Sequence, residues 1–369
     1  MFLLSGSIFG KVFQISTWGE SHGKALGVVI DGCPAGIPLC EEDIQLQLDR
    51  RKPGTSSFTT KRKESDTIQI LSGIFEGKTT GTPISMLVYN EDQRSKDYSQ
   101  IASYYRPGHA DYTFDKKYGF RDYRGGGRSS GRETLARVAA GAVAKKILSM
   151  LHINVYAYTY SIGAITIDKN QFSIEKINSN ALFMPDETAA KKAEEYLKQC
   201  MTNENSAGGI VECCVTGMPI GIGEPVFEKL DASLAKAIFS IGAVKGLEFG
   251  SGFACAASTG YENNDFFESD ENKTVKKSKN HAGGILGGIS DGSDIIFRAA
   301  FKPTPSIHKT QKTVATDGTP IEINIKGRHD PIIVPRAVVV VESMTAITIV
   351  DYLFQNMFSK MDNIMKFYQ

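Results

Sequence analysis

Residues 123–133 read Tyr-Arg-Gly-Gly-Gly-Arg-Ser-Ser-Gly-Arg-Glu. Three consecutive glycines allow the backbone to adopt positive φ angles and to approach a ligand closely. Ser130 and Glu133 have the spacing of a capping box, which closes the first turn of a helix. The apolar residues that follow recur with a helical period, at Leu135, Val138, Val143, Ile147 and Leu151. The stretch therefore predicts a glycine-rich loop that runs into the N-terminus of a helix.

An anion is the ligand that suits this loop. Backbone N–H groups, the positive end of the helix dipole and flanking arginines favour phosphate or carboxylate. The Gly-Lys-Ser/Thr of a nucleotide-binding phosphate loop is missing, and no apolar strand precedes the loop as in a dinucleotide-binding fold. For this stretch taken alone, a plain glycine turn with solvated arginines is the alternative.

Length, composition and charge limit the possible domain organisation and the class of ligand. The chain has 369 residues, which suffice for one large domain or two, and its 41% hydrophobic and 22% charged residues are ordinary for a globular protein. A net charge of +1 gives no general attraction to nucleic acid or to a membrane surface. Positive charge is gathered at residues 50–52, 61–63 and 121–137, which favours a small anionic ligand.

Cysteine spacing and apolar runs indicate the compartment. The cysteines at positions 33, 40, 200, 213, 214 and 255 have no metal-type spacing, so we expect free thiols in a reducing compartment and no metal site. The first residues are apolar but have no basic leader, and no apolar run approaches about 18 residues. We therefore expect neither a signal peptide nor a membrane span.

Periodicity and turn signals predict the secondary structure. Strands are expected at residues 7–18, 24–31, 67–71, 83–89, 155–167, 210–216 and 321–325. Helices are expected at 41–51, from 133 to about 151, and at 187–201, 227–239 and 335–358. The last helix should present one apolar side, formed by Val340, Met344, Ile347, Val350 and Phe354. The polar segment 263–280 predicts a flexible loop.

Two histidines lie on turns rather than on apolar faces. His22 lies in the turn 19–23 between the first two strands, and His109 lies in the turn 106–111 beside an arginine. An unperturbed histidine titrates near ~6.5, so either can exchange a proton at neutral pH. The glycine cluster 281–288 suits close approach to a flat ligand, or alternatively a pair of bulges.

Five motifs together resemble those of the chorismate synthase family. They are Gly-Glu-Ser-His-Gly at 19–23, Asp-Arg-Arg-Lys-Pro-Gly at 49–54, Arg-Pro-Gly-His-Ala-Asp at 106–111, Tyr-Arg-Gly-Gly-Gly-Arg-Ser-Ser at 123–130 and Gly-Arg-His-Asp-Pro at 327–331. They occur in the order of the family, and the resemblance extends from about residue 7 to residue 355. Five long motifs in register are highly specific.

The resemblance implies a fold and an activity. The family fold is an α+β β-α-β sandwich with helices between antiparallel sheets, here a single domain over residues 1–369, and the usual assembly is a homotetramer. Family members are cytoplasmic carbon–oxygen lyases. They convert 5-enolpyruvylshikimate 3-phosphate to chorismate and phosphate by a 1,4-anti elimination that requires reduced FMN, the last common step of the shikimate pathway to aromatic amino acids. Whether NADPH or an external flavin reductase supplies the electrons is left open.

The resemblance also assigns roles to residues. His22 would protonate the departing phosphate, His109 would keep the reduced flavin in its working protonation state, and Asp330 would assist proton removal. The substrate anions would be bound by Ser21, Arg51, Arg106, Ser130, Arg132 and Arg328. The flavin would be bound by Arg51, Arg128, Ser129, Ser130, Gly242, Ala243, Gly287, Lys302, Pro303, Thr304, Pro305, Ser306 and Arg328.

Three positions depart from the family pattern. Gly242 stands where asparagine is common, Gly131 replaces a common alanine, and Ser57 stands where arginine is frequent. The first and third put one flavin contact and one anion or nicotinamide-nucleotide contact in doubt.

Two other function classes fit parts of the sequence. A single-strand nucleic-acid-binding module could use Arg-Gly-Gly and tyrosines, but it should show repeated Arg-Gly-Gly or a basic pI. A phosphotransferase could use the glycine loop, but it should show a Walker lysine or paired metal-binding carboxylates.

Overall fold

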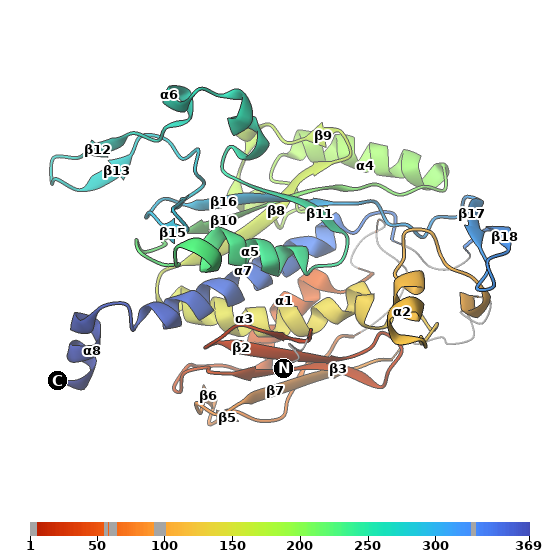
Figure 1. Cartoon of the computed structure of the whole chain (residues 1–369), viewed down its shortest axis with the longest axis horizontal. Helices are drawn as coiled ribbons and strands as arrows, with labels where there is room; N and C mark the ends of the chain where they lie inside the picture. The colour runs from red at the N-terminus through yellow and green to blue at the C-terminus, as the bar shows by residue number, and fades with distance from the viewer. Residues whose placement is uncertain (1–5, 55–57, 59–64, 92–100, 326–329) are drawn as a thin grey trace.

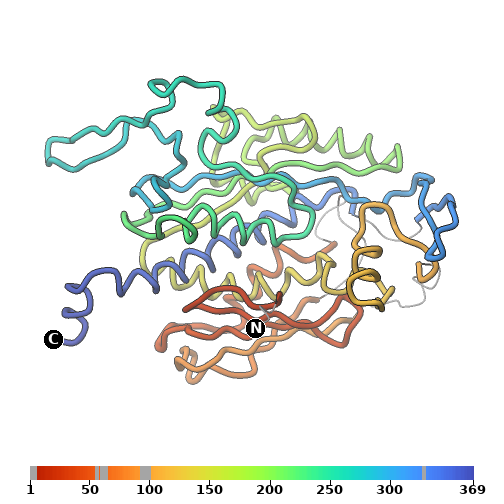
Figure 2. The backbone as a smooth tube through the Cα atoms, viewed as in Figure 1, coloured from red at the N-terminus to blue at the C-terminus, as the bar shows by residue number. Residues whose placement is uncertain are grey.

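The chain folds into two antiparallel sheets with a layer of helices between them (Figure 1). The computed structural model describes residues 6–54, 58, 65–91, 101–325 and 330–369. This arrangement is the β-α-β sandwich, of the α+β class, that the motifs predicted. Figure 2 shows the C-terminal helix projecting beyond the layers at the end of the chain.

The first sheet has the strand order β1-β2-β3-β7-β4. Its strands are β1 (Ile8–Phe9), β2 (Gln14–Gly19), β3 (Ala25–Asp31), β7 (Ile84–Tyr89) and β4 (Gln69–Ile70). Along β7 the buried residues Ile84, Met86 and Val88 alternate with more exposed ones, as expected for a sheet with one face on a core. The turn between β2 and β3 carries His22.

The second sheet has the order β11-β16-β10-β8-β9. Its strands are β11 (Val244–Phe249), β16 (Ile295–Phe301), β10 (Gly209–Thr216), β8 (Asn154–Ile162) and β9 (Ile165–Thr166). The sequence analysis did not predict β16, although Ile295, Phe297, Ala299 and Phe301 alternate along it as buried residues. This strand pairs with both β10 and β11, and it delivers residues 302–306 to the site.

Four helices fill the space between the sheets: α1 (Glu41–Arg51), α3 (Thr134–Met150), α5 (Leu230–Phe239) and α7 (Val334–Asn356). Helix α3 contacts β2 and β3, whereas α7 contacts β8 and β10. The two helices approach closely at Gly141, where a Cβ atom would lie 2.2 Å from the Cβ of Ser343. A side chain at this position would therefore force the two central helices apart.

Shorter elements surround these layers. Helix α4 (Glu187–Thr202) lies on the far side of the second sheet from the helical layer (Figure 1). The others are α2 (Asp111–Tyr118), α6 (Gly260–Asn263), α8 (Met361–Tyr368) and the hairpins β5–β6 (Ile74–Phe75, Lys78–Thr79), β12–β13 (Phe267–Ser269, Val275–Lys277), β14–β15 (Ile285–Leu286, Ile289–Ser290) and β17–β18 (Gln311–Val314, Pro320–Ile323).

Segment 263–280 has more structure than the sequence analysis predicted. It contains the hairpin β12–β13, whose base is closed by ion pairs from Lys277 to Asp265 (3.1 Å) and Asp291 (2.7 Å). The polar composition that suggested a loop reflects a hairpin with exposed faces and a buried charged base.

Helix α7 was expected to bury one side, but it is buried on all sides from Ala337 to Tyr352. Among the described residues it is the one helix long and apolar enough to cross a membrane, yet 89% of its most apolar stretch is buried inside the protein. It is therefore the core helix of the sandwich. Near its C-terminal end Asp351 accepts hydrogen bonds from the backbone N–H groups of Lys11, Val12 and Phe13, which tie α7 to the first sheet.

The buried carboxylate of Glu342 connects α7 to three other elements. It pairs with Arg50 at the end of α1 (2.6 Å) and Lys145 of α3 (2.8 Å), and it accepts the backbone N–H of Ala157 in β8 (3.0 Å). Burial alone would raise the pKa of Glu342, but the charges of Lys145 and Arg50 lower it to about 2. One charge thus holds the helical layer against the second sheet.

We predict that Glu342→Gln lowers the free energy of unfolding by about 3 kcal/mol at pH 7, because two half-buried cations lose their buried counter-charge. The folded pKa lies below the unfolded value of about 4.5, so this stabilisation is complete above that pH and is lost as the pH falls towards about 2. Urea unfolding should therefore show a smaller difference between variant and wild type at about pH 3.5 than at pH 7.

The matched control is Glu187→Gln on α4, which removes an exposed ion pair between Glu187 and Lys176. It should change stability by less than about 1 kcal/mol. If Glu342→Gln lowered the free energy of unfolding equally at both pH values, the role given to the Glu342 charge would be wrong.

Candidate active site

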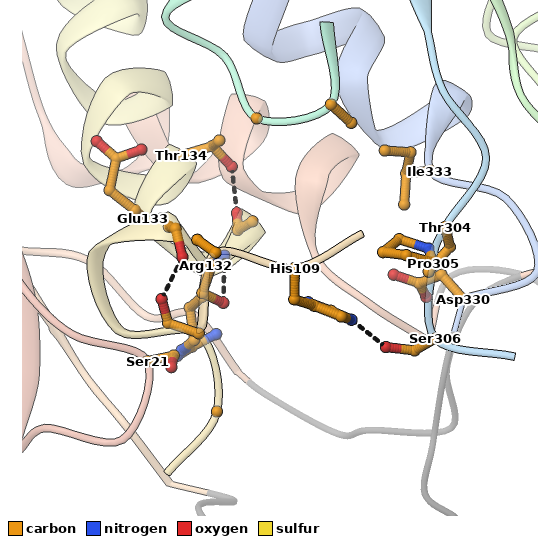
Figure 3. Close-up of a pocket in the computed structure, with 18 of the residues that line it drawn as sticks. Ser21, His109, Arg132, Glu133, Thr134, Thr304, Pro305, Ser306, Asp330 and Ile333 are labelled. Carbon is orange, nitrogen blue, oxygen red and sulfur yellow. Dashed lines mark hydrogen bonds between the residues drawn. The ribbon is translucent and has the colours of Figure 1, made fainter. Parts of the chain in front are cut away.

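A cavity of about 630 Å³ opens where the helical layer meets the loops from both sheets. This volume is typical of a small-molecule site. Its walls come from the β2–β3 turn, the end of α1, the loop before α2, the glycine loop before α3, the α5–β11 connection, the segment after β16 and the start of α7 (Figure 3). Segments far apart in the sequence therefore meet around one space.

Most residues named by the sequence analysis line this cavity. They are Ser21, His22, Arg51, Arg106, His109, Arg128, Ser129, Ser130, Arg132, Gly242, Ala243, Lys302, Thr304, Pro305, Ser306 and Asp330. The described lining does not include Pro303 or Gly287, and Gly287 lies in the turn between β14 and β15. Arg328, as well as Ser57, falls outside the described residues, so its contact stays a prediction.

The glycine loop enters α3 differently from the predicted capping box. Two short 3-10 helices, Gly127–Ser129 and Gly131–Glu133, precede α3, and the hydroxyl of Ser130 accepts the N–H of Arg132 (3.3 Å). The Glu133 carboxylate instead binds the Nε atom of Arg137 (2.9 Å). The capping box was therefore wrong, and Glu133 serves to hold an arginine that also lines the cavity.

His22 is held between its neighbour and the glycine loop. Its Nδ1 atom lies 3.1 Å from the hydroxyl of Ser21, and both residues are buried. Gly125 has a φ of +77°, and a Cβ atom there would lie 2.5 Å from the imidazole ring. Only glycine allows this backbone to pass so close to His22.

His109 contacts the segment that follows β16. Its Nε2 atom lies 2.7 Å from the hydroxyl of Ser306, towards which the ring points in Figure 3. The Nζ atom of Lys302 donates to the carbonyl of Gly108 (2.8 Å), next to His109. The His109 turn and residues 302–306 are thus linked twice at one wall of the cavity.

Two buried guanidinium groups share one carboxylate. Asp66 binds Arg51 through one oxygen and Arg132 through the other (2.9 Å). Burial, together with the nearby charges of Arg336 and Arg132, lowers the pKa of Arg51 to about 10 although Asp66 acts in the opposite direction. Burial would raise the pKa of Asp66, but the two arginines hold it below its usual value. This cluster therefore carries an excess of positive charge.

Among the described residues, two buried polar atoms at the cavity have no hydrogen-bond partner: Nε of Arg51 and Oγ1 of Thr304. Such groups are costly unless something satisfies them. Their positions on different walls support a polar ligand that reaches both.

Other predicted cations are held by the protein itself. Arg106 makes a bidentate pair with Asp111 (2.8 and 2.7 Å) and donates to the carbonyl of Gly125 (2.9 Å). Arg128 donates to the carbonyl and the hydroxyl of Thr17 (3.1 and 2.6 Å). These contacts fix the positions of the guanidinium groups at the cavity wall, and they attach the glycine loop to the first sheet and to the His109 turn.

The sequence analysis missed several functional positions. Arg336, in the first turn of α7, pairs with Asp330 (2.6 Å) and donates to the carbonyl of Arg51 (3.0 Å). Arg137 donates to the hydroxyl and carbonyl of Ser240, next to the 242–243 segment. Arg137 carried a signal, since it lies within the noted cationic cluster, whereas Asp66 stands in a polar segment without any pattern. Among the described residues, no group of three His, Cys, Asp or Glu side chains could hold a metal ion.

Comparisons with known proteins agree with one family. The family model described as chorismate synthase matches residues 13–354. A chorismate synthase of Agathobacter rectalis is 64% identical over 99% of this chain and 100% of its own length, and one of Cytophaga hutchinsonii is 51% identical over 96% and 99%. A crystal structure of a chorismate synthase superposes with a TM-score of 0.77 and 31% identity, over 97% of this chain and 96% of that one. Neither the phosphotransferase nor the nucleic-acid alternative is favoured.

The close packing of Gly125 on His22 generates a prediction. Gly125→Ala should lower turnover in a chorismate-forming assay by about 10²-fold, because the new Cβ atom displaces the imidazole by about 1 Å. Gly127→Ala is the matched control: Gly127 also has a positive φ, of +52°, but a Cβ atom there meets nothing within 4 Å. Equal losses in the two variants would mean that backbone strain, not the contact with His22, causes the effect.

Proposed function

The chain belongs to the chorismate synthase family and is an enzyme of that function, and we propose that its cavity binds 5-enolpyruvylshikimate 3-phosphate beside reduced FMN. The reaction is a 1,4-anti elimination that gives chorismate and phosphate, which makes the enzyme a carbon–oxygen lyase. The observation that carries the proposal is the meeting of His22, His109 and the arginine cluster around one cavity. The enzyme acts in the synthesis of aromatic amino acids.

The charge of the cavity supports a substrate with several acidic groups. The proposed substrate carries one phosphate and two carboxylates, and Arg51 and Arg132 bring two buried guanidinium groups to the same carboxylate, Asp66. Planar guanidinium groups bind such anions through paired hydrogen bonds. The Nε donor of Arg51, which has no hydrogen-bond partner in the described part of the chain, supplies one of these hydrogen bonds. Ser21, Ser130 and the arginines 106 and 328 complete the proposed substrate contacts.

The described residues fit a flavin at the opposite wall. The unsatisfied hydroxyl of Thr304, the Lys302 ammonium and the hydroxyl of Ser306 lie on one segment, next to the loop 242–243. Arg128 and Ser129 extend this wall to the glycine loop. These residues would hold reduced FMN, which would supply electron density for cleavage of the carbon–oxygen bond without a net change in its oxidation state.

The protein then has to move protons and exclude water. His22, oriented by Ser21, donates a proton to an oxygen of the departing phosphate. His109, whose Nε2 atom is oriented by Ser306, controls protonation at the flavin wall. The Asp330 carboxylate, held by Arg336, accepts a proton in the second half of the reaction. The cavity lies between the helical layer and the loops of both sheets, and this enclosure limits the access of water.

We also propose a homotetramer that acts in the cytoplasm, as the family resemblance implies. Gly287 lies outside the described cavity lining, so in this assembly a second copy of the chain would bring its own β14–β15 turn to the flavin. The source of electrons is either NADPH, used directly, or an external flavin reductase. An anaerobic assay that compares NADPH with dithionite separates these two sources.

The activity is tested directly with purified protein, chemically reduced FMN and the substrate under anaerobic conditions. We expect chorismate and phosphate in equal amounts, and a perturbed FMN absorption spectrum that strengthens when substrate is added. Failure to release phosphate under these conditions would overturn the proposed function.

His22→Ala and His109→Ala should each lower turnover by about 10²–10⁴-fold, the usual scale for a proton donor or acceptor. The control is His152→Asn, because His152 is exposed, away from the cavity, and has a positive φ that asparagine tolerates. Full activity of both alanine variants with reduced FMN would contradict the roles given to the two histidines.

A further inference from the structure

Asn90 lies directly after β7, between two parts of the site. Its side-chain oxygen accepts a hydrogen bond from Nε of Arg132 (2.5 Å). Its side-chain nitrogen donates to the carbonyls of Glu20 (3.1 Å) and Gly23 (2.8 Å), which are the two ends of the turn that carries His22. One amide therefore connects a substrate-binding arginine to the turn of the proton donor.

The orientation of this amide is determined by its partners. The guanidinium Nε can only donate and the two carbonyls can only accept, so the oxygen must face Arg132 and the nitrogen must face the turn. The backbone of Asn90 adds a further contact, since its N–H donates to the carbonyl of Lys24 (3.0 Å). Asn90 is half-buried and does not line the cavity. A side chain so fully used outside the cavity acts on its neighbours rather than on a ligand.

The histidine turn depends on these contacts. Inside the turn, one backbone hydrogen bond is formed, from the N–H of Gly23 to the carbonyl of Glu20 (3.1 Å). The two hydrogen bonds from Asn90 join the same two residues from outside. Arg132 also donates from Nη1 to Asp66, so Asn90 and Asp66 bind two different nitrogen atoms of the same guanidinium group.

We propose that Asn90 is a positioning residue that sets the distance between the His22 imidazole and the Arg132 guanidinium. The proposal rests on the proposed function, in which His22 protonates the departing phosphate and Arg132 binds a substrate anion. Small displacements of such groups strongly lower the reaction rate, since a shift of about 1 Å can lower it by about 10²-fold. Asn90 touches neither substrate nor flavin, so its effects must come through these two neighbours.

Two variants separate the two connections. Asn90→Asp keeps an oxygen that accepts from Arg132, but its carboxylate cannot donate to the carbonyls of Glu20 and Gly23. It should lower kcat by about 10-fold or more, because the histidine turn is released, and raise KM by no more than about 3-fold, because its negative charge offsets part of the charge of Arg132. Asn90→Leu, similar in shape, removes both connections, so it should raise KM by about 10-fold and lower kcat to at least the same extent.

Two further measurements exclude a general loss of structure. Calorimetric titration of flavin-free enzyme with 5-enolpyruvylshikimate 3-phosphate should show near-normal affinity for Asn90→Asp and weakened affinity for Asn90→Leu. Thermal unfolding of both variants shows whether they fold. The control is Asn154→Asp, at an exposed strand end of the second sheet, which should match wild type in kcat and KM.

The outcomes distinguish this proposal from the proposed function. If wild type forms chorismate and Asn90→Asp keeps the wild-type kcat, the positioning role is wrong while the function stands. Identical KM values for Asn90→Asp and Asn90→Leu would also overturn it, since the Arg132 connection would then be without effect. A wild-type enzyme that forms no chorismate contradicts the proposed function itself.

Discussion

The site depends on two buried guanidinium groups that share a single carboxylate. Arg51 is 1% exposed and Arg132 is 6% exposed, and both bind Asp66. Burying two guanidinium groups beside a carboxylate has a large desolvation cost, and the surrounding fold enforces this burial. The same buried groups favour an anionic ligand, because their paired N–H donors match the oxygens of a phosphate or carboxylate.

The fold enforces this cluster through the ends of its helices. Arg51 ends α1, Arg132 precedes α3 and Arg336 begins α7, so three helix termini bring cations to one place. Glu342 holds α1, α3 and α7 in their relative positions through its pairs with Arg50 and Lys145. The arginine that meets Asp66 and the arginine that meets Glu342 are neighbours in the sequence. Adjacent side chains thus point to different partners, one structural and one functional.

The sequence predicted the fold class, α1 to the residue, and most of the cavity lining, because these follow from local patterns or from motifs. It did not predict β16, although the alternation of buried residues along this strand is a local signal. It also did not predict the contacts of Asp66 with Arg51 and Arg132, which lie 15 and 66 residues away in the sequence. The capping box failed for a related reason. Glu133 had a better partner in Arg137, one turn further along the helix, than in the backbone at Ser130. Local sequence patterns indicate which side chains could interact, and the tertiary structure determines which of these contacts form.

Every functional segment lies at the end of a strand or helix, which explains why the site can be both rigid and assembled from distant motifs. The first sheet supplies the His22 turn, and the second sheet supplies residues 302–306 and, with α5, the loop 242–243. The helical layer separates the sheets and supplies the cations between them (Figure 1). Neither sheet with its own turns contains both the proposed proton donor and the proposed flavin wall. The cavity therefore forms only when the whole sandwich has folded, and stability of the central helices is a condition for catalysis.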